Sequence, residues 1–177
     1  MAPNPAQHPQ AGLLMRLHLM GGVGVICFIA VFLVLGHPVG AAAEGFFLGG
    51  LVLTFLWLRL RGTGVVPIAA YQIVALLVTI GVLTWSLGGL VPSGAIAIWA
   101  IISPLAAMMF LRRRGILLSS LAYVVLLGFT WAIEPRGAWV QPLPAALQLP
   151  LTVLNLLGGS ALALLTLGYF HAQLHAE

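Results

Sequence analysis

Six apolar segments, separated by five short breaks rich in glycine and proline, fill almost the whole chain. Each segment is close to the roughly 20 residues that an α-helix needs to cross the hydrocarbon core of a bilayer. With 62% hydrophobic and 6% charged residues, the chain lacks the charged surface of a soluble domain of this size. The sequence therefore predicts an all-α, polytopic membrane protein, a bundle of six transmembrane helices. The predicted spans are 14–36, 40–58, 65–88, 92–111, 115–133 and 144–170.

This segmentation predicts a single membrane domain. Residues 1–12 are rich in Pro, Gln and Ala and are predicted to form a disordered cytoplasmic tail. Residues 13–171 make up the predicted transmembrane domain, and residues 172–177 are predicted to begin a cytoplasmic signalling helix. None of the breaks is long enough to act as a linker between two domains.

The arginines predict the orientation of the chain. If the six spans alternate in direction, six of the seven arginines fall on one side of the membrane and Arg136 falls on the other. Because basic residues are enriched in cytoplasmic loops, both termini are predicted to be cytoplasmic, in the inner membrane of a bacterium. The predicted cytoplasmic arginines are Arg16, Arg59, Arg61, Arg112, Arg113 and Arg114.

Composition excludes several kinds of chemistry. The chain has no lysine and no aspartate, and it has only three glutamates. Schiff-base and phosphate-binding lysines are therefore absent, as are most mechanisms that use two carboxylates or a carboxylate-bound metal. His18 and His37 lie at the two ends of the first predicted span, and Cys27 has no metal-ligand spacing around it. We expect no catalytic residue, no cofactor and no metal in this chain, and no nucleic-acid partner.

Four polar residues lie within or beside the apolar segments, where polar groups are costly and often functional. Glu44 is expected near the outer start of the second span, with His37 and Arg136 as candidate partners. These groups could sense an external ligand or a proton, or Glu44 could be an interfacial carboxylate that reaches water. Gln72 and Asn155 could hydrogen-bond to a neighbouring helix or contact a ligand.

Small residues and one proline predict how the helices pack. Gly45 and Gly49 form a GxxxG pattern, and Gly158 and Gly159 are adjacent in the sixth segment. Glycine at such positions allows two helices to approach closely, so we expect packing contacts there and a homodimer. Pro104 interrupts the fourth segment and is predicted to kink its helix, which makes it a candidate hinge.

Arg112, Arg113 and Arg114 form a basic triplet between the fourth and fifth segments. A basic cluster at the cytoplasmic surface is attracted to anionic lipid headgroups. The triplet is therefore predicted to anchor the protein to the surface of the bilayer, which is its expected partner. Docking of a cytoplasmic protein is the alternative.

The second half of the chain carries three short motifs: WAIISPLAA over Trp99–Ala107, LNLLG over Leu154–Gly158, and Tyr169-Phe170 followed by Gln173-Leu174 and Ala176. In these motifs and in its six segments, the chain resembles the six-helix N-terminal membrane domain of bacterial class III adenylate and guanylate cyclases. A related module occurs in some sensor histidine kinases. The resemblance implies a helix, starting within residues 169–177, that leads to a dimeric catalytic domain.

The function expected from this resemblance is that of a membrane receptor or anchor that regulates an attached cyclase in signal transduction. The chain itself is not expected to be catalytic, because it has no aspartate to bind the metals of a cyclase. Two alternatives remain open. The chain could be a freestanding accessory subunit of a larger membrane complex, or a small transporter or lipid-handling protein.

Overall fold

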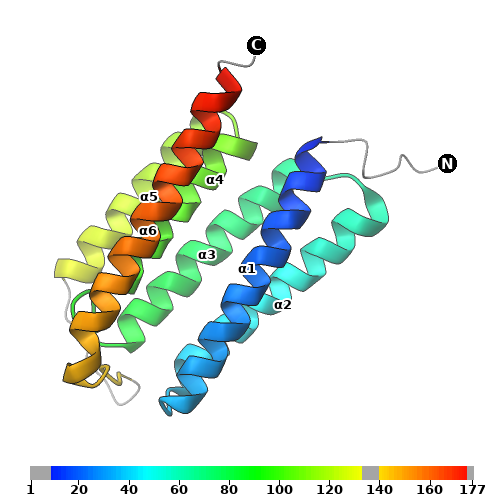
Figure 1. Ribbon diagram of the computed structural model, residues 1–177. Coiled ribbons are helices and arrows are strands. Elements are labelled where there is room, and N and C mark those ends of the chain that lie inside the picture. Colours follow the sequence, from blue (N-terminus) through cyan, green and yellow to red (C-terminus); the bar gives the residue numbers. More distant parts are fainter. Residues whose placement is uncertain (1–8, 133–139, 175–177) are drawn as a thin grey trace.

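The computed structural model describes residues 9–132 and 140–174, and every regular element within these ranges is a helix (Figure 1). The predicted all-α class is therefore confirmed for the described residues. The α-helices are α1 (Pro9–Val34), α2 (Pro38–Arg61), α3 (Val65–Ser86), α4 (Ile102–Phe110), α5 (Arg113–Ala132) and α6 (Ala145–Leu174), and a 3₁₀ helix, η2 (Ile96–Ile101), precedes α4.

Four helices are long and apolar enough to cross a membrane, as judged by length and composition. They are α1, α2, α3 and α5, with apolar stretches of 20 to 25 residues. The apolar stretches Ile96–Phe110, which joins η2 to α4, and Ala145–Ala161, in α6, are shorter. Several helices of this length and composition are typical of a membrane protein.

The first helix begins earlier than predicted. Residues 9–12 form the first turn of α1, so the predicted disordered tail over residues 1–12 is wrong for this part. Proline is tolerated at the start of a helix because its missing N–H would have no partner there. Helix α6 continues through residues 172–174, whereas residues 1–8 and 175–177 lie outside the described part of the chain.

The fourth predicted span, 92–111, is not one continuous α-helix. After α3 the backbone takes left-handed conformations, with φ of 93° at Gly88, 101° at Gly89, 65° at Gly94 and 58° at Ala95. Glycine adopts positive φ readily because it has no Cβ. These turns delay the next helix until Ile96, and it begins as the 3₁₀ helix η2.

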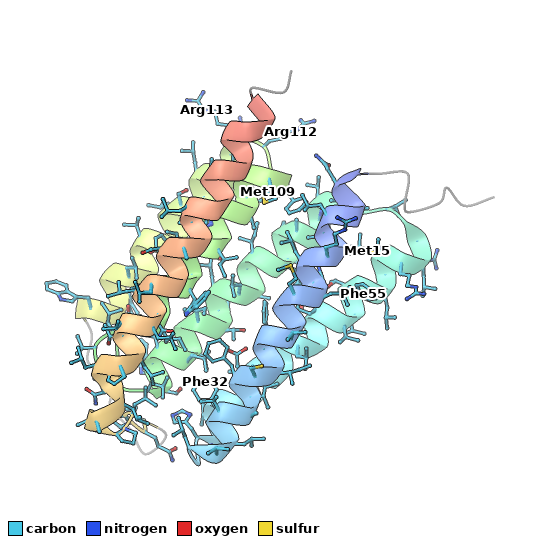
Figure 2. The ribbon with its side chains drawn as sticks, viewed as in Figure 1. Met15, Phe32, Phe55, Met109, Arg112 and Arg113 are labelled. Atoms are coloured by element: carbon cyan, nitrogen blue, oxygen red, sulfur yellow. The ribbon has the colours of Figure 1, made fainter. Side chains whose placement is uncertain are left out.

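Successive helices run up and down, so that the start of α1, the α2–α3 turn, the α4–α5 turn and the end of α6 share one end of the bundle (Figure 1). We call this the arginine end. Arg59 and Arg61 lie in the last turn of α2. Figure 2 shows Arg112 and Arg113 at the same end, beyond α4. The arrangement of the helices thus brings arginines that the sequence predicts to be cytoplasmic to the same end of the bundle.

Helix α3 joins two halves of the bundle. On one side of α3, the helices α1 and α2 pack together; on the other side, α4 and α5 pack with η2, and α6 packs mainly on η2. Among the described residues, α1 makes no extensive contact with α4, α5 or α6. A seam therefore runs between α1 and the second half.

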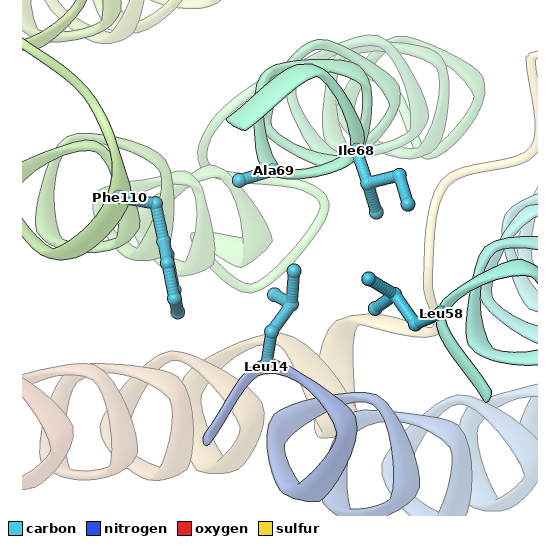
Figure 3. Packing of buried hydrophobic residues seen from close by; sticks show 5 residues of the cluster. All are labelled: Leu14, Leu58, Ile68, Ala69 and Phe110. Carbon is cyan, nitrogen blue, oxygen red and sulfur yellow. The ribbon is translucent and has the colours of Figure 1, made fainter. Parts of the chain in front are cut away.

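At the arginine end a hydrophobic cluster bridges this seam (Figure 3). It combines buried side chains from the first four α-helices, so that α1 and α4 share a core although their backbones lie apart. Its members are Leu14 from α1, Leu58 from α2, Ile68 and Ala69 from α3 and Phe110 from α4.

Candidate functional site

Three side chains from three helices form a hydrogen-bonded network in the half of the bundle nearer the arginine end. They are His18 of α1, Thr54 of α2 and Gln72 of α3, and we call them the polar triad. His18 is only 4% exposed. Its Nε2 lies 2.9 Å from Thr54 Oγ1. Gln72 Nε2 donates to Thr54 Oγ1 at 2.6 Å and to the backbone oxygen of Gly50 at 3.1 Å.

Backbone carbonyl groups determine which nitrogen atoms of the triad act as donors, because a carbonyl oxygen can only accept a hydrogen bond. His18 Nδ1 lies 2.7 Å from the Leu14 oxygen, so this nitrogen carries a hydrogen and donates it. In a neutral imidazole Nε2 is then an acceptor, and the Thr54 hydroxyl is its donor. The Gly50 oxygen likewise requires the amide nitrogen of Gln72 to face it. Gln72 Oε1 is left buried without a partner among the described residues.

The triad has partners for His18 in either protonation state. When the imidazole is neutral, Thr54 donates its hydroxyl hydrogen to His18 Nε2. When Nε2 is protonated, it donates to Thr54 Oγ1, and the Thr54 hydroxyl turns to the Gly50 oxygen 2.7 Å away. The change requires only the rotation of one hydroxyl group. The three side chains can therefore stay hydrogen-bonded in either protonation state of His18.

Replacing Thr54 by valine is expected to lower the free energy of unfolding by about 1–3 kcal/mol, because it leaves His18 Nε2 and a Gln72 N–H buried without partners. The readout is the thermal unfolding of the purified protein in detergent. Thr54→Ser is the matched control, since it keeps the hydroxyl and is expected to retain most of the stability. Equal losses in both variants would contradict the hydrogen bonding described for the triad.

A cavity of about 280 Å³ lies beside the triad, between α1, α2, α3 and α4. His18 and Gln72 contribute to its wall, and no charged residue lines it within the described ranges. Leu14, Ala69 and Phe110 belong both to this wall and to the cluster that bridges the seam (Figure 3). The cavity is therefore closed towards the arginine end by apolar side chains and has polar groups on one side only.

Asn155, a predicted polar site residue, links α6 to the second half of the bundle. Its Oδ1 accepts from Trp99 Nε1 at 2.9 Å, and its Nδ2 donates to the Gly94 oxygen at 2.8 Å. The side chain is only 5% exposed. Its amide thus bonds to both η2 and the turn that precedes η2, as expected of a structural link between helices.

The predicted packing glycines lie in two different environments. A Cβ on Gly158 would lie 2.9 Å from a Trp99 ring carbon, and one on Gly159 would lie 2.7 Å from Ile98 Cγ2. The close approach of α6 to η2 therefore depends on the missing side chains. Gly45 and Gly49 have no heavy atom within 4 Å of the Cβ position and are exposed. Their packing against a second copy stays a prediction.

His37 and Glu44 are both buried near the end opposite the arginine end, without forming an ion pair among the described residues. His37 Nδ1 accepts from the Gly40 N–H at 3.0 Å and so caps the start of α2. His37 Nε2 is therefore the protonated nitrogen, and it is buried without a partner in the described part of the chain. Arg136, the other candidate partner of Glu44, lies outside the described residues.

Pro104 lies in the first turn of α4, just after the 3₁₀ helix gives way to the α-helix at Ile102. Because η2 runs directly into α4, Pro104 has no N–H to donate to the carbonyl groups at the end of η2. Pro104 thus marks the junction of two helix types, whereas the sequence predicts a kink within one continuous α-helix.

The arginine triplet is exposed. Arg112, Arg113 and Arg114 lie at the turn between α4 and α5, and the side chains of Arg112 and Arg113 extend outward from the arginine end (Figure 2). Their position suits contact with a membrane surface or with another protein. Elsewhere, no three residues of the metal-binding types come together within the described ranges.

Comparisons of this chain with models of protein families, with curated proteins and with solved structures found no match. The resemblance to the membrane domains of class III cyclases therefore rests only on the short motifs of the second half and on the pattern of six apolar segments. The functional hypothesis therefore depends mainly on the geometry of the triad, the cavity and the arginine end.

The sequence prediction includes Gln72 but omits its two partners, His18 and Thr54. It places His18 at the end of the first span and gives it no role. His18 follows Leu14 by four residues and precedes Val25 by seven, and both are buried. This helical spacing places His18 on the buried face of α1, and it is the signal that identifies the residue from the sequence.

Proposed function

We propose that this chain is the membrane-embedded receptor or anchor domain of a signalling protein in the bacterial inner membrane. The observation that carries this proposal is the polar triad beside an uncharged cavity, at the seam where the two halves of the bundle meet. A molecule in the cavity would contact α1 and α4 at once, so its binding would favour one relative position of the two halves.

The arrangement of arginines and tryptophans supports six crossings with both termini in the cytoplasm. The arginine end collects the basic residues, which are enriched on the cytoplasmic side of membrane proteins. Trp85 and Trp131 lie near the last turns of α3 and α5, at the opposite end. Tryptophan is enriched at the membrane–water interface, so this end is the expected outer boundary of the bilayer.

The lengths of the fourth and sixth helical segments fit this topology. η2 and α4 together measure about 26 Å, and with the preceding turn they can cover the roughly 30 Å hydrocarbon core. Helix α6 measures about 45 Å and is longer than the core requires. Its C-terminal turns would therefore project from the arginine end and carry a change in packing to an attached domain. A cyclase is the attached domain that the motif resemblance implies.

The orientation can be tested by cysteine labelling in a Cys27→Ser background. Thr63 is exposed at the α2–α3 turn, and Val91 is exposed after α3, at the opposite end. In intact cells, a membrane-impermeant maleimide is expected to label the Val91→Cys variant. It should label the Thr63→Cys variant only after permeabilisation. The reverse pattern would contradict the orientation, and labelling of both variants in intact cells would contradict a membrane-spanning α3.

The receptor function predicts that the native polypeptide is larger than 18.6 kDa, the mass of this chain. An immunoblot of source membranes, with an antibody raised against residues 134–144, measures that mass. A much larger band is expected, and the additional part would identify the effector. A band at 18.6 kDa would instead favour an accessory subunit, for which the exposed Gly45 and Gly49 would be the packing face.

A further inference from the structure

The cavity beside the triad is partly open, has no charged residue of the described ranges in its wall, and has an unused polar atom beside it. Its wall comes from four α-helices and includes two polar side chains, His18 and Gln72. The lining residues of α1 are Leu14, Leu17, His18, Met20 and Gly21, those of α2 are Phe47 and Leu51, those of α3 are Ala69, Gln72, Ile73 and Leu76, and those of α4 are Ile102, Ala106 and Phe110.

Within the triad, hydrogen bonding is complete except at one atom. Both nitrogens of His18, the hydroxyl of Thr54 and the amide nitrogen of Gln72 have partners. Gln72 Oε1 is buried and has none among the described residues. An unsatisfied buried acceptor is unfavourable by about 1–3 kcal/mol, so a donor brought into the cavity would gain a partner that the protein does not supply.

We propose that this cavity binds an uncharged, ring-sized lipophilic molecule whose hydroxyl group donates to Gln72 Oε1. The amide turns about χ3, a torsion with a broad profile, to present Oε1 to the cavity. The bond from Gln72 Nε2 to Thr54, at 2.6 Å, is shorter than the one to Gly50, at 3.1 Å. The same Nε2 atom makes both bonds, so the turn of the amide changes the geometry of both.

The volume and the lining specify the class of ligand. At about 30 Å³ per water-sized group, the cavity of about 280 Å³ holds one ring system, or one end of a longer apolar molecule. Ionised ligands are disfavoured, because no charged residue within the described ranges lines the wall to compensate for their loss of hydration. Most of the wall is apolar, so it fits a hydrocarbon body with one polar group.

Two further hollows in the described part of the chain are less suited to such a ligand. The cavity between α1, η2 and α6 measures only about 90 Å³, and the side-chain amide of Asn155 in its wall is already paired. The groove between α3 and α5 is an open apolar surface, and its Thr130 hydroxyl donates to the Leu127 oxygen. The cavity beside the triad is therefore the better site.

Equilibrium binding of 1-naphthol and naphthalene to the purified chain in nanodiscs tests this inference. Empty nanodiscs give the background partitioning of both probes. We expect saturable binding of 1-naphthol at one site, about five- to tenfold tighter than naphthalene, as one net hydrogen bond allows. Binding of 1-naphthol no greater than in empty nanodiscs, or equal affinity for the two probes, would overturn the proposal.

Two variants locate the site. Ala106→Trp fills the cavity and is expected to abolish saturable binding of both probes, whereas Ala30→Trp, on an exposed face of α1, should leave it unchanged. Gln72→Leu is expected to reduce 1-naphthol binding to the level of naphthalene. Unaltered 1-naphthol binding by a folded Ala106→Trp variant would place the site elsewhere and contradict the assignment. If that variant does not fold, the comparison of the two probes on the unaltered chain decides.

This inference deepens the proposed receptor function and rests on it for its biological meaning. The two can fail separately, because binding to the purified chain depends on the cavity alone, whereas the labelling and immunoblot experiments depend on topology and on the native polypeptide. Saturable binding by a chain of 18.6 kDa would keep the site and discard the attached effector.

Discussion

Replacing Asn155 by leucine is expected to lower the free energy of unfolding by about 2–3 kcal/mol. The substitution removes two hydrogen bonds between α6 and the rest of the bundle, from Trp99 Nε1 and to the Gly94 oxygen. It leaves a buried N–H and a carbonyl without partners where water has little access. Thermal or denaturant unfolding of the purified protein in detergent measures the loss.

A double-mutant cycle with Trp99→Phe tests the cause of this loss. Phenylalanine has no side-chain N–H. In the double variant, the loss of Asn155 therefore leaves no indole donor without a partner. We expect the two substitutions together to cost about 1 kcal/mol less than the sum of the single effects, as is usual for groups in direct contact. Strict additivity would show that the contact between Trp99 and Asn155 does not contribute to stability.

Replacing Gly94 by alanine adds only one methyl group but is expected to destabilise the protein strongly. Gly94 has a φ of 65°, and a Cβ there would lie 2.8 Å from Leu151 Cβ and 3.3 Å from the backbone nitrogen of Thr152. The left-handed backbone costs a non-glycine residue about 1–2 kcal/mol, and overpacking against α6 adds about 1–3 kcal/mol. The apparent unfolding temperature in detergent should fall accordingly.

Gly36→Ala is the matched control for Gly94→Ala. Gly36 has a φ of 68°, almost the same as Gly94, but no heavy atom lies within 4 Å of its Cβ position. It therefore carries the backbone cost without the steric one and should destabilise the protein less. Equal losses in the two variants would mean that α6 does not press against the turn at Gly94.

The helices were predictable where an apolar run coincides with a helical backbone. They were less predictable where an apolar region has a backbone that is not helical. Apolar length locates α1, α2, α3 and α5 to within a few residues, because a long apolar run with a break at each end admits one helix. The region after α3 is just as apolar, so hydropathy extends a helix from residue 92. The positive φ of Gly94 and Ala95 overrides this pattern, and no measure of hydrophobicity detects it.

The site was predictable as single residues rather than as contacts. Gln72 and Asn155 are conspicuous amides in apolar segments, but their partners depend on which helices become neighbours. Thr54 and Trp99 are ordinary residues in a membrane helix, and they become informative only across an interface. The predicted grouping of Glu44 with His37 relied on their expected position at the same side of the membrane, whereas the structure uses His37 as a cap for α2.

The division of the bundle about α3 has a consequence for biogenesis. Every partner of the polar triad lies between Leu14 and Gln72, and the partners of Asn155 lie at Gly94 and Trp99. Each of these hydrogen bonds therefore forms within one half of the polypeptide. The first three helices can complete their hydrogen bonds while the ribosome is still translating the remainder, so the nascent chain need not hold the triad unpaired in lipid.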